Sequence, residues 1–227
     1  MTLTKNTARL RQEVAAHVAA DSIVQGTYWD SGNESGCFIG CLAKSADPTI
    51  NEATYGLPVM VQRIAENIFE ALHADEAKAF FAALPDAVSC DGKDLTKIGW
   101  QFLAVELRNL PKQPAEIQAV IDPVIAGMDL LASGQEWPAA DAAWAARAAA
   151  RATADATAVS ATAVAAAAAW AAADAAEAAE AAEVDAAWAV VRAAEAANAA
   201  ARPAVRLRQR DLLLRLIAEA PVVENYQ

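Results

Sequence analysis

The segment that most constrains the fold is residues 139–201, where alanine fills 39 of 63 positions and neither glycine nor proline occurs. Because alanine has the highest intrinsic helix propensity and nothing here breaks a helix, the segment is predicted to be α-helical throughout. One straight helix would be roughly 95 Å long. Threonine, valine and serine cluster at 153–162 and weaken the helix there. This favours a helical hairpin bent near the cluster, and a single rod stays open.

Large and charged side chains recur about every third residue in this segment. Each three-residue step falls about 60° short of a full helical turn, so these side chains spiral around the helix instead of forming one apolar face. The alanine surface between them lets another helix approach closely. We therefore interpret the segment as a docking element, not a core element. Its predicted partner-binding residues are Trp170, Asp174, Glu177, Glu180, Glu183, Asp185 and Trp188.

The rest of the chain shows shorter amphipathic helices. Apolar residues at helical spacing give one group at Leu3, Leu10, Val14 and Val18, a second after Pro58 at Val61, Ile64, Ile68 and Leu72, and a third at Ala77, Phe80, Phe81 and Leu84 that should end at Pro85. Asp94 is the expected N-cap of a fourth helix, with apolar stripes at Leu95, Ile98, Phe102 and Val105 and at Trp100, Leu103 and Leu107. Pro114 and Pro123 suit first turns, and Gly134 suits a helix end.

The expected fold is therefore all-α. We predict a compact helical domain at 1–138, the alanine-rich section at 139–201, and a C-terminal amphipathic helix with its tail at 202–227. That last helix should turn Val205, Leu212, Leu213, Leu216 and Ile217 inward, turn Arg206, Arg210 and Arg215 outward, end before Pro221 and dock on the first domain.

A glycine-rich stretch at 25–56 resists a helical interpretation, except for a short helix near residues 37–44. Such a loop in a helical domain is a natural place for a functional site. If Cys37 opens a helix, the helix dipole should lower its pKa and make it a nucleophile. The alternative is that Cys37 and Cys41 are small buried thiols. The two histidines, His17 and His73, have local structural explanations, and the cysteine spacing matches no metal site.

The aromatic pair Tyr28 and Trp29 also allows two interpretations. Beside a glycine-rich turn these rings could stack on a flat ligand such as a nucleobase, or they could cap the core. The ligand-binding alternative assigns the pocket to Thr27, Tyr28, Trp29, Asp30, Cys37 and Cys41. No cofactor is expected in either case, because the phosphate-loop ending Gly-Lys-Ser or Gly-Lys-Thr does not occur.

The charge balance limits the partners. A net charge of −11 and a pI near 4.6 argue against direct nucleic-acid binding and favour a partner with a basic surface. The polar N-terminus lacks a signal-peptide core, and the alanine-rich part is too weakly apolar to span a membrane. Three cysteines form an odd, sparse set that is typical of a reducing compartment. We therefore expect a cytoplasmic location.

Three sequence segments carry a resemblance: QGTYWDSGNESGCFIGCLAKS, YGLPVMVQRIAENIFEAL and DLTKIGWQFLAVELRNL. They resemble a loosely defined set of small proteins encoded by bacteriophages and prophages, over roughly residues 20–110. The resemblance implies a protein in the host bacterial cytoplasm that counters host defence. It leads us to expect a non-enzymatic inhibitor of a defence effector, such as a CRISPR nuclease complex, that binds through the acidic helix. Sequestration of a nucleotide signal and a Cys37-dependent enzyme are the alternatives.

Overall fold

The computed structural model of the protein describes residues 2–110, 115–138, 141 and 202–223. Nearly all of the predicted alanine-rich helix, with its partner-binding residues 170–188, lies outside this part. The chain divides into two units, of which the first joins residues 1–98 to 206–227 and the second spans 99–205. The predicted boundaries after residues 138 and 201 stay predictions, because residues 139–140 and 142–201 lie outside the described part of the chain. The second unit therefore lies, in sequence, between the two segments of the first.

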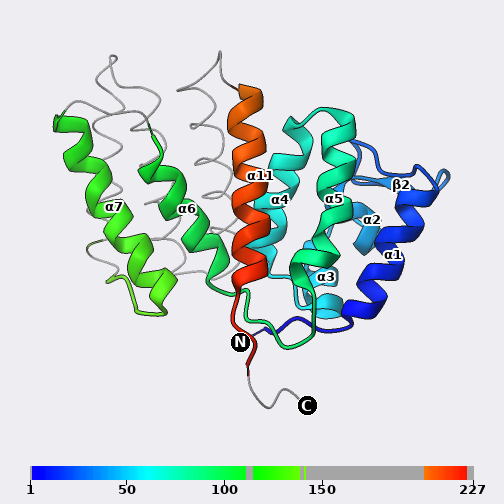
Figure 1. The fold of residues 1–227 in the computed structure, drawn as a ribbon, viewed down its shortest axis with the longest axis horizontal. Coiled ribbons are helices and arrows are strands. Elements are labelled where there is room, and N and C mark those ends of the chain that lie inside the picture. Colours follow the sequence, from blue (N-terminus) through cyan, green and yellow to red (C-terminus); the bar gives the residue numbers. More distant parts are fainter. Residues whose placement is uncertain (1, 111–114, 139–140, 142–201, 224–227) are drawn as a thin grey trace. The chain divides into compact units, whose positions relative to one another are not determined.

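The first unit is helical apart from one small sheet (Figure 1). Its elements in chain order are α1 (Thr7–Ala19), β1 (Trp29–Asp30), β2 (Ser35–Gly36), α2 (Phe38–Ala43), α3 (Pro48–Tyr55), α4 (Val59–Ala71), α5 (Ala74–Val88) and most of α11 (Arg202–Glu219). The strands pair antiparallel, with Trp29 opposite Gly36. The helical fold class is confirmed, and the short helix predicted near 37–44 is α2. Among the described helices, none is long and apolar enough to cross a membrane.

The core of this unit is built around α4, which contacts α2, α3 and α5. The predicted stripe on α4 is confirmed, since Val61, Ile64 and Ile68 are all buried. Beside it the ring of Phe38 on α2 meets three other phenylalanine rings, with centroids 5.2 to 6.1 Å away, at Phe69, Phe80 and Phe81. Burying each of these side chains contributes roughly 1.5 to 3 kcal/mol. This cluster fixes α2, which carries both cysteines, against α4 and α5.

Two predictions for the first and third helices are wrong. Val18 is 46 % exposed, and His17 takes the inner position near the end of α1. The His17 ring is accommodated because its Nδ1 lies 2.7 Å from the Ser22 hydroxyl. Pro85 lies inside α5, which continues to Val88. Proline costs the helix one hydrogen bond there. Burial of Pro85 and Val88 in the last turn offsets that cost.

The C-terminal helix α11 belongs to the first unit from Arg206 onward, as predicted. Most of its predicted inner residues are buried, although Leu216 is only partly so. Arg206 is a correction, because it was expected outside and is buried. Its guanidinium donates to the side-chain oxygen of Gln209, itself buried, at 2.9 Å. The inner face of α11 therefore accommodates a polar pair, which an apolar periodicity cannot reveal.

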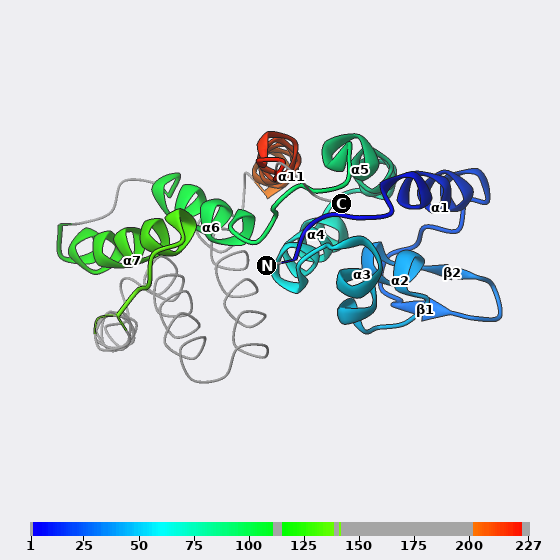
Figure 2. The same cartoon turned by 90° about the horizontal axis from the view of Figure 1, so that it is seen from below.

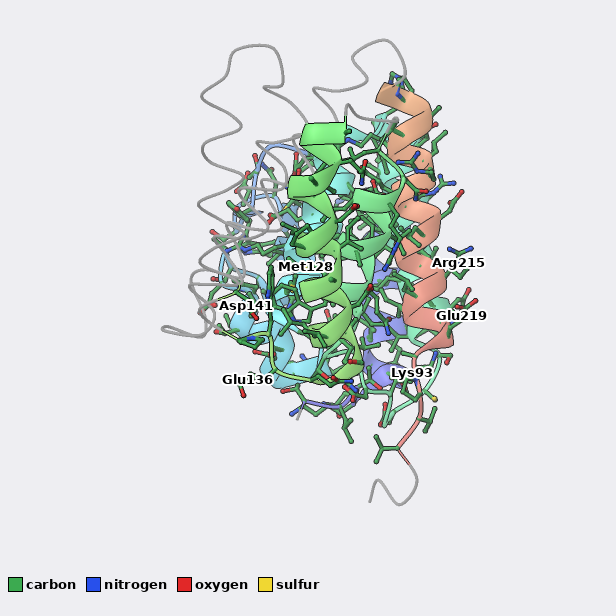
Figure 3. All side chains as sticks on the ribbon, turned by 90° about the vertical axis from the view of Figure 1, so that its left-hand side faces the viewer. Lys93, Met128, Glu136, Asp141, Arg215 and Glu219 are labelled. Carbon is green, nitrogen blue, oxygen red and sulfur yellow. The ribbon has the colours of Figure 1, made fainter. Side chains whose placement is uncertain are left out.

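A buried lysine ties α11 to the rest of the unit. The Lys93 ammonium donates to the carbonyls of Ala87, Ile217 and Ala218 at 2.7 to 3.2 Å, at the C-terminal ends of α5 and α11. Figure 3 shows Lys93 near the end of α11 where Glu219 lies. Backbone hydrogen bonds also join the two terminal segments to residues 92–94. The Thr4 amide donates to the Lys93 carbonyl, the Asp94 amide to the Pro221 carbonyl and the Val223 amide to the Gly92 carbonyl. Both ends of the chain therefore meet at residues 92–94.

In the second unit the structure describes α6 (Ile98–Arg108, whose first residue still belongs to the first unit) and α7 (Ala115–Ser133), drawn in Figure 2. The prediction of Asp94 as the N-cap of this helix is wrong, because α6 begins only at Ile98; Asp94 instead accepts from the Thr96 amide in the preceding turn. Of the two predicted stripes on α6, all residues except the half-buried Val105 are buried. Pro123 lies inside α7 instead of in a first turn, which corrects the prediction. Gly134 follows the helix end with φ of 79°, as expected of a helix-terminating glycine.

Candidate functional site

The glycine-rich stretch folds into a hairpin that is anchored on α4. The side-chain amide of Gln25 donates to the carbonyls of Phe69 and Leu72 at 2.6 and 2.9 Å. These carbonyls lie at the end of α4, where the Phe69 carbonyl also accepts from the Leu72 amide at 3.3 Å. Next to it the Gly26 amide donates to the Glu70 carboxylate at 2.8 Å. The first arm of the hairpin is therefore fixed before its strand begins.

Two glycines explain how the hairpin crosses α2 so closely. The Tyr28 carbonyl lies where a Cβ atom would be on either glycine: 2.3 Å from an ideal Cβ on Gly36 and 1.3 Å from one on Gly40. Any side chain there would displace the hairpin backbone. Tyr28 and Thr27 both accept from the Cys37 amide, at 3.2 and 2.8 Å. The pattern Gly-Cys-x-x-Gly-Cys is therefore a packing surface for the segment that contains Tyr28.

The tip of the hairpin is held by Asp30. Its carboxylate accepts from the Gly32 amide at 2.8 Å and from the Asn33 side chain at 2.6 Å. These hydrogen bonds, that from Asn33 first, lower the pKa of Asp30. We did not predict the strands or α3. Asp30 with Gly32 and Asn33, and Asp47 before Pro48, are the turn and capping signals that could have shown them.

Beneath the hairpin, four polar side chains from three parts of the unit form a connected cluster. The Cys37 thiol donates to Glu66 Oε1 at 3.3 Å, and Arg63 Nη1 donates to Glu66 Oε2 at 3.0 Å. The same Arg63 nitrogen donates to the Tyr28 hydroxyl at 3.1 Å, and its guanidinium carbon lies 5.8 Å from the centre of that ring. We call Tyr28, Cys37, Arg63 and Glu66 the hairpin cluster. The spacing of three residues on α4 places Arg63 and Glu66 on one helix face.

Burial sets the electrostatics of the hairpin cluster. Cys37 is 1 % and Glu66 2 % exposed. Desolvation, reinforced by the neighbouring Glu66, raises the pKa of the Cys37 thiol to about 12. Burial also raises the pKa of Glu66, against the lowering effect of Arg63 and Cys37. The thiol is therefore protonated at neutral pH. The expected lowering of its pKa by the helix dipole is wrong, because α2 has only six residues and burial outweighs its dipole.

The second cysteine is buried like the first. Cys41 is fully buried, its thiol lies 3.1 Å from the Gly36 carbonyl, and burial raises its pKa to about 11. The interpretation of Cys37 and Cys41 as small buried thiols is confirmed. Cys90, in contrast, is partly exposed.

The six residues assigned to a ligand pocket lie close along the hairpin and α2, but their side chains have different partners. Trp29 meets the His17 ring edge-on at 6.0 Å, whereas Tyr28 lies beside Arg63 and is 42 % exposed. Asp30 is held in the turn, Thr27 is exposed, and the two thiols are buried. The structure therefore divides the aromatic pair: Trp29 turns inward and Tyr28 outward.

Sequence reasoning missed the residues that organise this region, namely Gln25, Arg63, Glu66 and Glu70. A charged pair three residues apart beside the apolar stripe of α4 was the available signal. It indicates a salt bridge on a helix, which is usually exposed. Only the position of the hairpin reveals that Glu66 is buried beneath it.

A small cavity lies elsewhere in the first unit. It has a volume of about 10 Å³ and is lined by Phe38, Leu57, Val61, Gln62, Ala65, Phe80, Leu84, Leu213 and Ile217. This is about the minimum space for one water molecule, and the lining is almost entirely apolar. We regard it as a packing defect of the core, not as a ligand site.

The comparisons add no functional assignment. Within the ranges that the structure describes, no group of three or more histidine, cysteine, aspartate or glutamate residues could hold a metal ion. Comparison with protein-family models, curated proteins and solved structures found no match.

Proposed function

We propose that this protein acts without catalysis, by binding and inhibiting an effector of bacterial anti-phage defence. The observation that supports binding over catalysis is the hairpin cluster. Its thiol is buried, protonated and hydrogen-bonded to a carboxylate, so the best candidate nucleophile is used to hold the hairpin in place. Nucleophilic catalysis needs the opposite: an accessible thiol with a low pKa.

The charge supports a basic partner. A net charge of −11 attracts positively charged surfaces and speeds their association. Many defence effectors must themselves bind nucleic acid, which requires basic surfaces. The acidic row Asp174, Glu177, Glu180 and Glu183 is our proposed contact, and the resemblance to phage-encoded proteins supplies the biological context.

A nucleotide signal is less well supported as the ligand. Arg63 is the cation nearest to Tyr28, and Glu66 already neutralises it through a contact at 3.0 Å. Glu70 occupies the Gly26 amide that a phosphate could otherwise approach. The Arg63 guanidinium and the Gly26 amide each already have a carboxylate partner, which disfavours an anionic ligand at Tyr28.

The proposal is tested by neutralising the acidic row in the full chain. Asp174→Asn with Glu177→Gln, Glu180→Gln and Glu183→Gln keeps the helical residue types while removing four charges. The variant and the wild type are expressed in bacteria that carry single defence systems, including CRISPR nucleases, and phage plaques are counted. We expect the wild type to restore plaques against at least one system, and the variant to lose most of that effect.

The matched control removes four exposed carboxylates outside both the acidic row and the hairpin: Asp75, Glu136, Asp141 and Glu219, each changed to its amide. Both variants have the same net charge, so an effect of overall charge alone would appear equally in both. The proposal is abandoned if no defence system is inhibited by the wild type. A role for the acidic row is abandoned if both variants inhibit equally.

A further inference from the structure

We propose that the exposed Tyr28 ring is a second contact for the basic partner, where it receives a lysine or arginine side chain, and that the buried residues of the hairpin cluster position it. This inference rests on the proposed function for the existence of a basic protein partner. It concerns a different part of the chain from the acidic row and is tested separately.

The first argument is that Tyr28 is held rigidly although its ring is exposed. Its carbonyl is fixed over Gly36 and Gly40, its hydroxyl accepts from Arg63, and the Arg63 guanidinium lies against the ring. Exposed side chains usually lose conformational freedom when they bind, and this loss weakens the complex. A tyrosine already fixed in the free protein avoids most of that loss. Tyrosine is also among the residues enriched at the energetic centres of protein interfaces.

The second argument concerns the buried residues that hold the Tyr28 ring in place. Placing a carboxylate at 2 % exposure carries a desolvation cost that an ion pair offsets only in part. The two oxygens of Glu66 are each used, one by Arg63 and one by the Cys37 thiol. Stability alone would be served as well by apolar residues. The arrangement has a clear result, which is the fixed position of Arg63 and, through it, of the Tyr28 ring.

The third argument identifies the partner group from the local charge. Residues 25–71, which include the hairpin and α4, carry two cations, Lys44 and Arg63, against six carboxylates: Asp30, Glu34, Asp47, Glu52, Glu66 and Glu70. Burial raises the pKa of the Tyr28 hydroxyl, and the charge of Glu66 raises it further, whereas the charge and the hydrogen bond of Arg63 lower it. An electron-rich ring face in a negative surrounding favours a cation. A lysine or arginine on a protein surface supplies both the charge and the aliphatic stem that packs on the ring.

The experiment measures binding of hexalysine to the full chain by calorimetry at low salt. Tyr28→Leu keeps an apolar side chain of similar bulk and removes the ring. We expect it to weaken hexalysine binding about three- to tenfold, the range of one cation–π contact. Ile50→Ala, which truncates another exposed apolar residue of the same unit, should leave binding unchanged. Circular dichroism verifies that both variants are folded.

Glu66→Gln tests the positioning role, because this side chain cannot touch the peptide. We expect about a twofold or greater loss of hexalysine binding, while Asp75→Asn, which removes one exposed charge on α5, should have less effect. The inference is overturned if Tyr28→Leu binds hexalysine as the wild type does, if the wild type gives no heat, or if nucleotides bind at Tyr28 instead. These results leave the plaque assay on the acidic row unaffected, so the two proposals can fail independently.

Discussion

Two charged side chains are buried to almost the same extent in the first unit, and they are stabilised in different ways. Glu66 is 2 % exposed and Lys93 is 4 % exposed. Lys93 is surrounded by neutral carbonyls at two helix ends, where the helix dipoles favour a cation. Glu66 has an arginine three residues away and a thiol above it. Lys93 connects residues more than 120 positions apart, whereas Glu66 connects a hairpin to the adjacent helix.

The difference teaches that burial of a charge does not by itself indicate a functional site. Lys93 closes the first unit, because its three hydrogen bonds join α5 to α11, two helices that the residues of the second unit separate in the sequence. Glu66 does not connect distant helices of the unit. It binds Arg63, which in turn binds the hydroxyl of the exposed Tyr28. We therefore expect substitution of Lys93 to affect stability, and substitution of Glu66 to affect the surface.

The largest expected effect comes from Lys93→Met, which keeps the aliphatic stem and removes the ammonium. Three carbonyls would lose their donor, so we expect the free energy of unfolding to fall by about 3 to 5 kcal/mol. Urea denaturation followed by circular dichroism measures this, with Lys44→Met on the surface as the control. Equal stability of the two variants would mean that Lys93 does not close the unit.

The next effect is expected from Gly40→Ala, because the new Cβ would lie 1.3 Å from the Tyr28 carbonyl. The hairpin must move away from α2, and we expect a loss of about 2 to 3 kcal/mol. Amide exchange should become faster in residues 25–36 in particular. Gly32→Ala is the control, since its Cβ would meet only the Asp30 side chain at 3.2 Å. Unchanged exchange in the hairpin would contradict the packing described here.

A smaller effect, about 1 kcal/mol, is expected from Glu66→Gln, because Arg63 is partly exposed and can turn to solvent. Its pH dependence is more informative. The folded-state pKa of Glu66 lies above its ordinary value of 4.5, so ionisation is disfavoured in the fold. The contribution of Glu66 to stability is therefore full below about pH 4.5 and falls as pH rises through the folded-state pKa. The difference in stability between wild type and Glu66→Gln should fall over that range, and a constant difference would contradict it.

The smallest effect on stability is expected from Cys90→Ser, a substitution that should instead change how fast the protein reacts with a thiol reagent. In the folded protein a chromogenic disulfide reagent should label one thiol rapidly, that of Cys90, and all three after unfolding. With a pKa of about 12 instead of 9, the thiolate fraction of Cys37 is roughly a thousandfold lower at neutral pH. Cys90→Ser should abolish the rapid reaction without changing stability. Rapid labelling of Cys37 would reopen the enzyme hypothesis.

The sequence alone predicted the helices whose apolar spacing is regular, because that spacing is a local property. The buried stripe of α4 is an example. The end of α7 was predicted from another local signal, the glycine at position 134. The sequence also identified Cys37 and Cys41 as candidates for burial, and the loop at 25–56 as the unusual region. Its prediction for residues 139–201 stays a prediction, because they lie outside the described part of the chain.

Only the tertiary structure decided which polar residues are buried. Val18, predicted to face the core, is exposed, and His17 is buried beside Ser22, whose hydroxyl lies 2.7 Å from the imidazole. Arg206 lies on the inner face because Gln209 accepts from it. In the sequence, Glu66 and Lys93 look like ordinary surface charges. In the structure both are buried, Glu66 beneath the hairpin and Lys93 against α11. The physical reason is that a polar group can be buried only where partners are provided. Some partners are near in sequence, as Ser22 is to His17, whereas those of Lys93 on α11 are more than 120 residues away. Apolar periodicity therefore determined helices such as α4, and hydrogen bonds from the hairpin and α2 to α4 determined the hairpin cluster.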